Sequence, residues 1–245
     1  MSENKQASNE SESEALEEGI FYPDAIRLPG VRMRVRGDYP QEFPIGAIVH
    51  STDGRPNDGK QSTEFGASEG KFAYFVIGRT GDVYQSFSLK NWGEHAGPTR
   101  HPTLGNRLSR KLVGIEIVSA GKLKKIDDNR FRPWYNDKPT RQTPKLSDDF
   151  TADQVRFRDS VGSRDKFGFQ TAGHYHQFTE AQEVALTKLL KWMHEQRPAI
   201  FKLENVLGHD ESAVEDDGTY GRKSDPGASL SVPMKEFRDR LVANG

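Results

Sequence analysis

The hydrophobic and polar positions of this chain form short apolar runs separated by longer polar stretches rich in glycine. Residues 45–49 and 112–118 are apolar runs of a length typical of buried strands. Residues 72–77 and 82–87 flank the turn Gly78-Arg79-Thr80-Gly81, which predicts a β-hairpin. No convincing helical pattern lies between the first strand and Gly70, so we expect no helix there.

Two helices are predicted in the C-terminal third. Thr179-Glu180-Ala181-Gln182 has the composition of a capping box, and Pro198 ends the helical pattern that follows it. The apolar residues of that pattern are Leu186, Leu189, Leu190 and Met193. A second helix is expected to begin near Pro233, with an apolar face of Met234, Phe237 and Leu241. Residues 151–161 are interpreted as a further short helix.

The interleaving of strands and helices favours the α/β class, with a mixed central β-sheet flanked by helices. Residues 21–245 are predicted to form a single domain, and the long polar segment 122–178 is predicted to be an insertion in it. Residues 1–20 are expected to be a disordered acidic tail, because the first 19 contain six glutamates and few residues that could be buried.

Composition narrows the classes of protein that the chain can belong to. The sequence of 245 residues contains no cysteine, which excludes disulfides and thiolate metal sites. It has no apolar run long enough for a membrane span and no signal region, so the compartment is left open between the cytoplasm and non-classical export. Outside the acidic tail the small excess of basic residues suits an anionic polymer but does not indicate nucleic acid.

The candidate chemistry lies at the ends of two apolar runs. His50 directly follows the strand predicted at 45–49, and His209 follows the apolar pair Val206-Leu207 and Gly208. Lys223 and Asp225 lie two positions apart in a polar run and would face the same side if that run is extended. Two histidines and one carboxylate are a ligand set for a catalytic zinc, because a fourth position remains open for water.

Glu116 is the only charged residue of the run 112–118. A carboxylate among apolar side chains is costly to bury unless an interaction compensates for it. A structural ion pair would explain Glu116. We favour a functional acid or base, because desolvation raises the pKa of a carboxyl group into a useful range.

Five blocks of the sequence resemble the zinc-dependent type-2 N-acetylmuramoyl-L-alanine amidases, the superfamily that includes the peptidoglycan recognition proteins. The similarity covers most of residues 40 to 240. The blocks are AIVHST (47–52), YFVIGRTGDVYQ (74–85), WGEHAG (92–97), LVGIEI (112–117), and LGHDE (207–211) with GRKSDPG (221–227).

The resemblance implies a role for each candidate residue. It implies that one Zn²⁺ per chain is bound by His50, His209 and Asp225, and that Glu116 and Lys223 are the catalytic pair. Some relatives carry cysteine at the third ligand position, where this chain has the carboxylate. Residues expected to contact substrate are His95, Trp92, Arg222 and Trp134.

The resemblance also implies an activity: hydrolysis of the amide between N-acetylmuramic acid and L-alanine in peptidoglycan or muropeptides. The alternatives are a module that binds peptidoglycan without cleaving it and an enzyme for a different amide. The sequence does not distinguish a recycling enzyme from a phage lysin or a delivered toxin, and it indicates no protein partner.

The insertion 122–178 contains many aromatic residues, among them Trp134 and Tyr135, with Arg130 and Arg132 beside them. It leaves the domain directly after the strand that carries Glu116. We therefore expect it to cover the cleft and bind glycan or peptide. The alternative is a small satellite core that only supports the domain.

Overall fold

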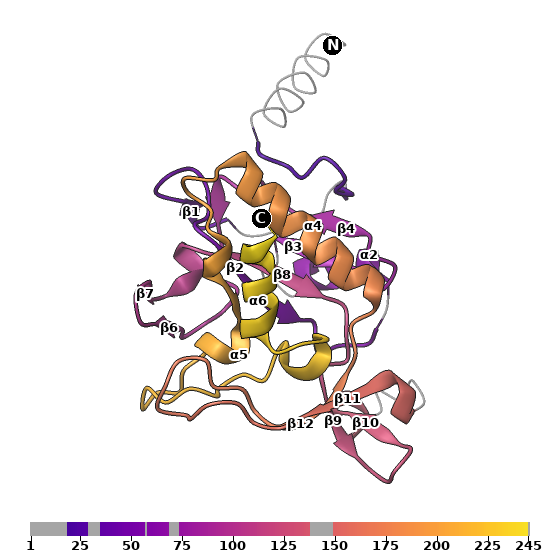
Figure 1. Cartoon of the computed structure of the whole chain (residues 1–245). Helices are drawn as coiled ribbons and strands as arrows, with labels where there is room; N and C mark the ends of the chain where they lie inside the picture. Colours follow the sequence, from indigo (N-terminus) through magenta and orange to yellow (C-terminus); the bar gives the residue numbers. More distant parts are fainter. Residues whose placement is uncertain (1–18, 29–34, 57, 69–73, 138–148, 245) are drawn as a thin grey trace, which may run out of the picture.

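The structure, a computed structural model, describes residues 19–28, 35–56, 58–68, 74–137 and 149–244. Almost all of the predicted acidic tail (1–20) lies outside these residues, so its disorder stays a prediction. Figure 1 shows a central sheet with helices in front of it and a smaller lobe beside its lower end.

The central sheet has five strands in the order β13, β2, β8, β3, β4. Their bounds are Val206–Gly208, Ala47–Ser51, Val113–Ile117, Phe75–Ile77 and Val83–Gln85. The first four are mutually parallel, and β4 pairs antiparallel with β3 through the predicted glycine turn. The mixed α/β sheet and the hairpin predicted from the sequence are therefore confirmed.

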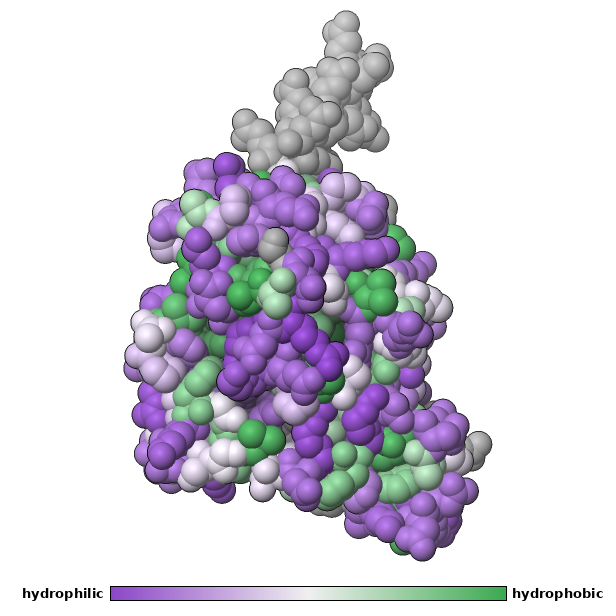
Figure 2. All heavy atoms as spheres, viewed as in Figure 1, coloured by the Kyte–Doolittle hydropathy of each residue, from purple (hydrophilic) through white to green (hydrophobic). Residues whose placement is uncertain are grey.

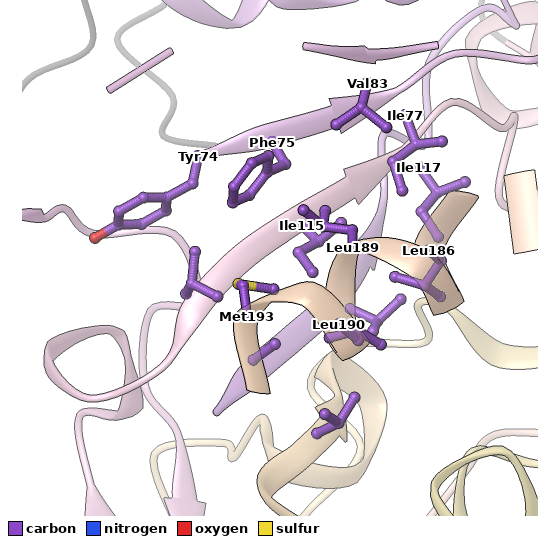
Figure 3. Packing of buried hydrophobic residues seen from close by; sticks show 14 of the residues in the cluster. Tyr74, Phe75, Ile77, Val83, Ile115, Ile117, Leu186, Leu189, Leu190 and Met193 are labelled. Atoms are coloured by element: carbon purple, nitrogen blue, oxygen red, sulfur yellow. The ribbon is translucent and has the colours of Figure 1, made fainter. Parts of the chain in front are cut away.

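One face of this sheet is covered by α4 (Glu180–Gln196) and α6 (Met234–Ala243). The predicted capping box begins α4, since Thr179 Oγ1 accepts from the Gln182 amide at 3.1 Å and Gln182 Oε1 accepts from the Thr179 amide at 3.0 Å. Figure 3 shows the apolar side chains of α4 packing against those of β3, β4 and β8. Each fully buried leucine of this core contributes roughly 1.5–3 kcal/mol.

Two local predictions were wrong. A helix, α2 (Gly59–Ser68), lies where none was expected, and it buries only Gly59 and Thr63. Asp58 caps it by accepting from the Gln61 amide at 2.7 Å. Residues 151–161 form one 3₁₀ turn (Ala152–Gln154) and then β11 (Val155–Arg158), not a helix. The alternation of Val155, Arg156, Phe157 and Arg158 has the period of a strand, and β12 supplies its partner.

The insertion forms its own antiparallel sheet in the order β10, β9, β12, β11. Its remaining bounds are Phe131–Pro133 for β10, Lys122–Lys125 for β9 and Gly173–His176 for β12. A small core of Ala120, Leu123, Phe131 and Phe150 packs beneath it, and the short helix α3 (Trp134–Asp137) follows β10. The insertion is thus a folded lobe over its described residues.

The remaining elements are short. They are β1 (Gly37–Asp38) paired with β5 (Asn91–Trp92), β6 (Arg100–His101) paired with β7 (Gly105–Asn106), α5 (His209–Ser212), and 3₁₀ turns at Leu108–Arg110, Leu203–Asn205 and Gly227–Ser229. The face in Figure 2 is mostly hydrophilic, with small scattered apolar patches. Over the described ranges, no helix has the length and apolar character needed to cross a membrane.

Candidate metal centre and active site

Parallel pairing of β2 with β13 brings the two candidate histidines together. Gly208 is the register partner of Val49. His50 and His209 each come one residue later, so they lie next to each other at the ends of neighbouring segments of the same chain. Side chains alternate along a strand, and Val49 points into the large core under α4. His50 therefore points to the opposite face of the sheet, away from α4 and α6.

Asp225 completes the group from an irregular segment. Its backbone carbonyl accepts from the Asp210 amide at 2.7 Å, which fixes the segment against α5. Asp225 Oδ2 lies 3.0 Å from His209 Nδ1 and 3.3 Å from His50 Nδ1, and the two Nδ1 atoms are 3.0 Å apart. All three side chains are buried, with exposed fractions of 5% or less.

The outer nitrogens of these rings determine the tautomers. His209 Nε2 lies 2.9 Å from the Ala96 carbonyl, which can only accept, so this nitrogen carries the proton. His95 Nε2 donates in the same way to the Leu112 carbonyl at 2.9 Å. His95 Nδ1 is then the acceptor for His50 Nε2, 2.9 Å away. In the neutral rings, the Nδ1 atoms of His50 and His209 are therefore unprotonated.

Three acceptor atoms thus face one another without a proton between them. Burial and the neighbouring His209 lower the pKa of His50 to about 4, so the ring is neutral at pH 7. Burial alone would raise the pKa of Asp225, but His209 and His50 lower it below its ordinary value and keep the carboxylate charged. These three residues are therefore a group that could hold a metal ion.

The donor set fits zinc. Two neutral imidazole nitrogens and one carboxylate oxygen are the ligands of many catalytic zinc sites. Tetrahedral bonds of about 2.0–2.1 Å place neighbouring ligand atoms roughly 3.3–3.4 Å apart. The distances of 3.0, 3.0 and 3.3 Å among these three atoms are close to that value.

Glu116 lies directly beside the metal group. It is the register partner of His50 across the parallel pair β2 and β8, so the two side chains project from the same face of the sheet. Adjacent strands are about 4.8 Å apart, so the Glu116 and His50 side chains leave the sheet next to each other. The structure therefore brings Glu116 to the site that the sequence predicted for it.

His95 lies over Gly114, the residue two positions before Glu116. A Cβ at position 114 would approach His95 Cγ and Nδ1 to 2.7 Å, so only glycine leaves room for the ring. Both ring nitrogens of His95 are used, one by His50 and one by the Leu112 carbonyl. His95 is therefore placed to orient His50, and its expected substrate contact stays a prediction.

Lys223 and Arg222 have different environments. Lys223 is exposed, and its charge contributes to lowering the pKa of His50, which places the ammonium near the metal group. Arg222 donates from Nη2 to the Ala96 carbonyl at 2.7 Å and from Nε to the Val214 carbonyl at 3.0 Å. Arg222 therefore holds the loop of His95 against the segment after α5, and its expected substrate contact stays a prediction.

The two tryptophans have different surroundings. Trp92, in β5, packs against the large core, and the Arg110 guanidinium lies 5.2 Å from its ring centre. Trp134, in α3, is 65% exposed, and its indole N–H donates to the carbonyl of Asp53, three residues after His50. The insertion thus contacts the segment of a metal-site residue through Trp134. Substrate binding by either tryptophan remains untested.

Asp53 is a site residue that the sequence reasoning missed. Its backbone has a positive φ of 48°, and its side chain occupies the space beside Gly121, where a Cβ would clash with Oδ1. Burial, and secondly the negative charge of Asp225, raise the pKa of Asp53 to about 7. The sequence offered no signal for Asp53, because neither its positive φ nor its contact with Gly121 can be seen before the chain is folded.

The chain was compared with protein families and known structures. Residues 40–228 match the family model Amidase_2, described as N-acetylmuramoyl-L-alanine amidase. No curated protein sequence matches the chain.

Three similar solved structures have identities below 20%. A selenomethionine derivative of AmpD has 17% identity and a TM-score of 0.49, over 90% of this chain and 96% of that one. AmpDh3 from Pseudomonas aeruginosa, in complex with anhydromuramic pentapeptide, has 19% identity and a TM-score of 0.46, over 88% and 65% of the two chains. AmiD from E. coli, in complex with an anhydro-muropeptide substrate, has 18% identity and a TM-score of 0.48, over 85% and 61%.

Proposed function

Since the chain belongs to the N-acetylmuramoyl-L-alanine amidase family, we propose that it uses zinc to hydrolyse the amide between N-acetylmuramic acid and L-alanine in peptidoglycan or muropeptides. Family membership makes the protein an amidase that acts on peptidoglycan. The observation that supports zinc dependence is the group of three inward-facing acceptors, His50 Nδ1, His209 Nδ1 and Asp225 Oδ2.

His50, His209 and Asp225 would hold the zinc. A zinc ion there supplies Lewis acidity, which lowers the pKa of water towards about 7 and polarises a carbonyl. His95 and the Ala96 carbonyl fix the outer nitrogens of the two imidazoles and so keep their inner lone pairs available. Both rings thus present Nδ1 towards Asp225.

Glu116 is proposed as the general base. It lies one strand away from His50 on the same face of the sheet, where a carboxylate could accept a proton from attacking water. The same carboxyl group can then give that proton to the leaving amine of L-alanine. General acid–base catalysis of this kind typically contributes about 10²- to 10⁴-fold to the rate.

Lys223 is proposed to stabilise the oxyanion that forms on the substrate carbonyl. Lys223 is exposed and its charge acts on His50, so its ammonium could approach a carbonyl held beside His50. The loss of one such stabilising donor typically costs about 100- to 1000-fold in rate.

A binding-only module is the weaker alternative. Such a protein has no need for a complete ligand set next to a carboxylate, and this chain has both, in His50, His209, Asp225 and Glu116. The chemistry of the site is compatible with metal-assisted hydrolysis, whereas amide hydrolysis and the choice of the muramoyl-alanine amide rest on the family.

The test uses the purified full chain. Zinc content is measured by atomic absorption, and products from a soluble anhydro-muropeptide and from purified sacculi are identified by mass spectrometry. We expect about one zinc per chain, release of the free stem peptide, and loss of both zinc and activity in Asp225→Ala. A variant Asp225→Ala with full zinc content and turnover would refute the ligand assignment, and products cut elsewhere would refute the substrate.

A further inference from the structure

The segment that follows Asp225 is held by two arginines of the insertion. Arg158 donates from Nη1 to the carbonyl of Gly227 at 3.0 Å and from Nη2 to the carbonyl of Leu230 at 2.8 Å. Arg156 donates from Nη1 to the carbonyls of Ala228 and Ser229, both at 3.1 Å. Four consecutive buried carbonyls, beginning two residues after Asp225, therefore accept from two side chains of β11, and the Ser229 carbonyl also accepts from the Phe178 amide at 2.8 Å.

The strand geometry of β11 makes this arrangement possible. Arg156 and Arg158 are two residues apart, so their side chains project from the same face of the lobe's sheet. Residues 227–230 lie against that face, as Figure 1 shows for the loop beside β11 and β12. A guanidinium is a planar group with several donors, and Arg158 uses two of its nitrogens to span two carbonyls, which the single nitrogen of a lysine cannot reproduce. Arg156 reaches its two carbonyls from Nη1 alone.

Other residues of the lobe reach the same two ligand segments. Tyr175 in β12 packs so closely on Gly227, which has a φ of +51°, that a Cβ there would lie 2.3 Å from the ring. Gln170 Nε2 donates to Asp210 Oδ2 at 2.8 Å, and the same oxygen accepts from the Gly227 amide at 3.2 Å. Asp210 in turn donates its amide to the Asp225 carbonyl at 2.7 Å.

We propose that Arg156 and Arg158 are positioning residues for the metal centre, through which the inserted lobe fixes the Asp225 carboxylate opposite His50 and His209. The proposal rests on the proposed function, in which Asp225 is a zinc ligand. Asp225 comes from an irregular segment, whereas His50 lies in β2 and His209 directly follows β13 of the central sheet. The lobe supplies the rigidity that this segment lacks, and a metal ligand must be held to within about 0.5 Å.

The test measures zinc affinity and metal-free stability on the same protein preparations. Arg158→Gln and Arg156→Gln are compared with the parent by competition with a chromogenic chelator, using Zn²⁺ alone. The control is Arg130→Gln, which removes an arginine from the same lobe. Its Nε donates to Asp127 Oδ2 at 2.6 Å in an exposed hairpin, and this pair is separate from residues 227–230.

We expect the zinc affinity of Arg156→Gln and of Arg158→Gln to fall about 10- to 100-fold, the range typical for residues that orient a metal ligand. The zinc affinity of Arg130→Gln should match that of the parent. If Arg158→Gln does not fold, Arg158→Lys carries the test, because it keeps the charge but loses the two-carbonyl geometry. Variants with parental zinc affinity and a lowered Tm would overturn the inference and leave the proposed function intact. A parent that binds no zinc would overturn both.

Discussion

Replacing Gly114 with alanine is the smallest change that should disable the metal site without touching a ligand. The added Cβ would lie 2.7 Å from Cγ and Nδ1 of His95, whereas carbon atoms in contact are about 3.5–4.0 Å apart. The His95 ring would therefore have to move by roughly 1 Å. Its hydrogen bond with His50 Nε2, now 2.9 Å, would then lengthen beyond the range in which it contributes.

The size of the effect follows from what that hydrogen bond does. It keeps the proton of His50 on Nε2 and leaves Nδ1 free for the metal. Loss of a partner that orients a ligating histidine typically weakens metal binding about 10- to 100-fold. That factor corresponds to about 1.4–2.8 kcal/mol of zinc-binding free energy.

The assay is chelator competition for Zn²⁺ on Gly114→Ala, His95→Ala and the double variant. Gly54→Ala is the matched control, because a Cβ there would meet only the Thr52 carbonyl, at 3.7 Å. If Gly114 acts through His95, the double variant binds zinc no more weakly than His95→Ala alone. Parental zinc affinity in Gly114→Ala, or additive losses in the double variant, would refute this reasoning.

Three further predictions concern other residues. Glu116→Gln should retain zinc and fold but lose at least about 100-fold in kcat, measured by single-substrate kinetics, since an amide cannot accept the proton; turnover within a few-fold of the parent would make Glu116 structural. Trp134→Ala should leave Tm nearly unchanged, because the indole is 65% exposed, and should raise KM for muropeptides; an unchanged KM would exclude a substrate contact. The metal-free protein should lose stability as the pH falls from about 6.5 towards 3. Burial lowers the pKa of His176 to about 3, so in this window only the unfolded chain takes up the proton. Urea titrations of His176→Gln should show a shallower loss over the same range, and an unchanged slope would contradict this assignment.

The parts of the fold that the sequence predicted are those with strong hydrophobic periodicity. Leu186, Leu189, Leu190 and Met193 recur at helical intervals because they fill one core, and all four are fully buried in α4. Helix α2 has no such signal, since it buries only Gly59 and Thr63 and depends on its contacts with β3 and β4. A helix defined by its neighbours rather than by its own pattern is not readable from one sequence.

The candidate site divides in the same way. The apolar run before His50 and the isolated carboxylate Glu116 could be found from local pattern, and the resemblance supported the grouping of His50 with His209 and Asp225. The role of His95 could not be found, because it depends on two carbonyl acceptors and on the space above Gly114. The role of Arg156 and Arg158 depends on which loop lies opposite β11, and that is decided by tertiary packing alone.

The parallel neighbours β2 and β13 come from opposite ends of the domain's sequence. His50 lies in the first strand of the central sheet along the chain, whereas His209 and Asp225 come after its last strand. During synthesis, a ribosome-bound chain can therefore complete β2, β3, β4 and β8 without possessing a metal centre. The hydrolytic site forms only after the C-terminal quarter of the chain has left the ribosome and β13 has paired with β2. Because this pairing closes a very long loop, we expect it to be a late step, so a nascent amidase remains catalytically silent until its fold is nearly finished.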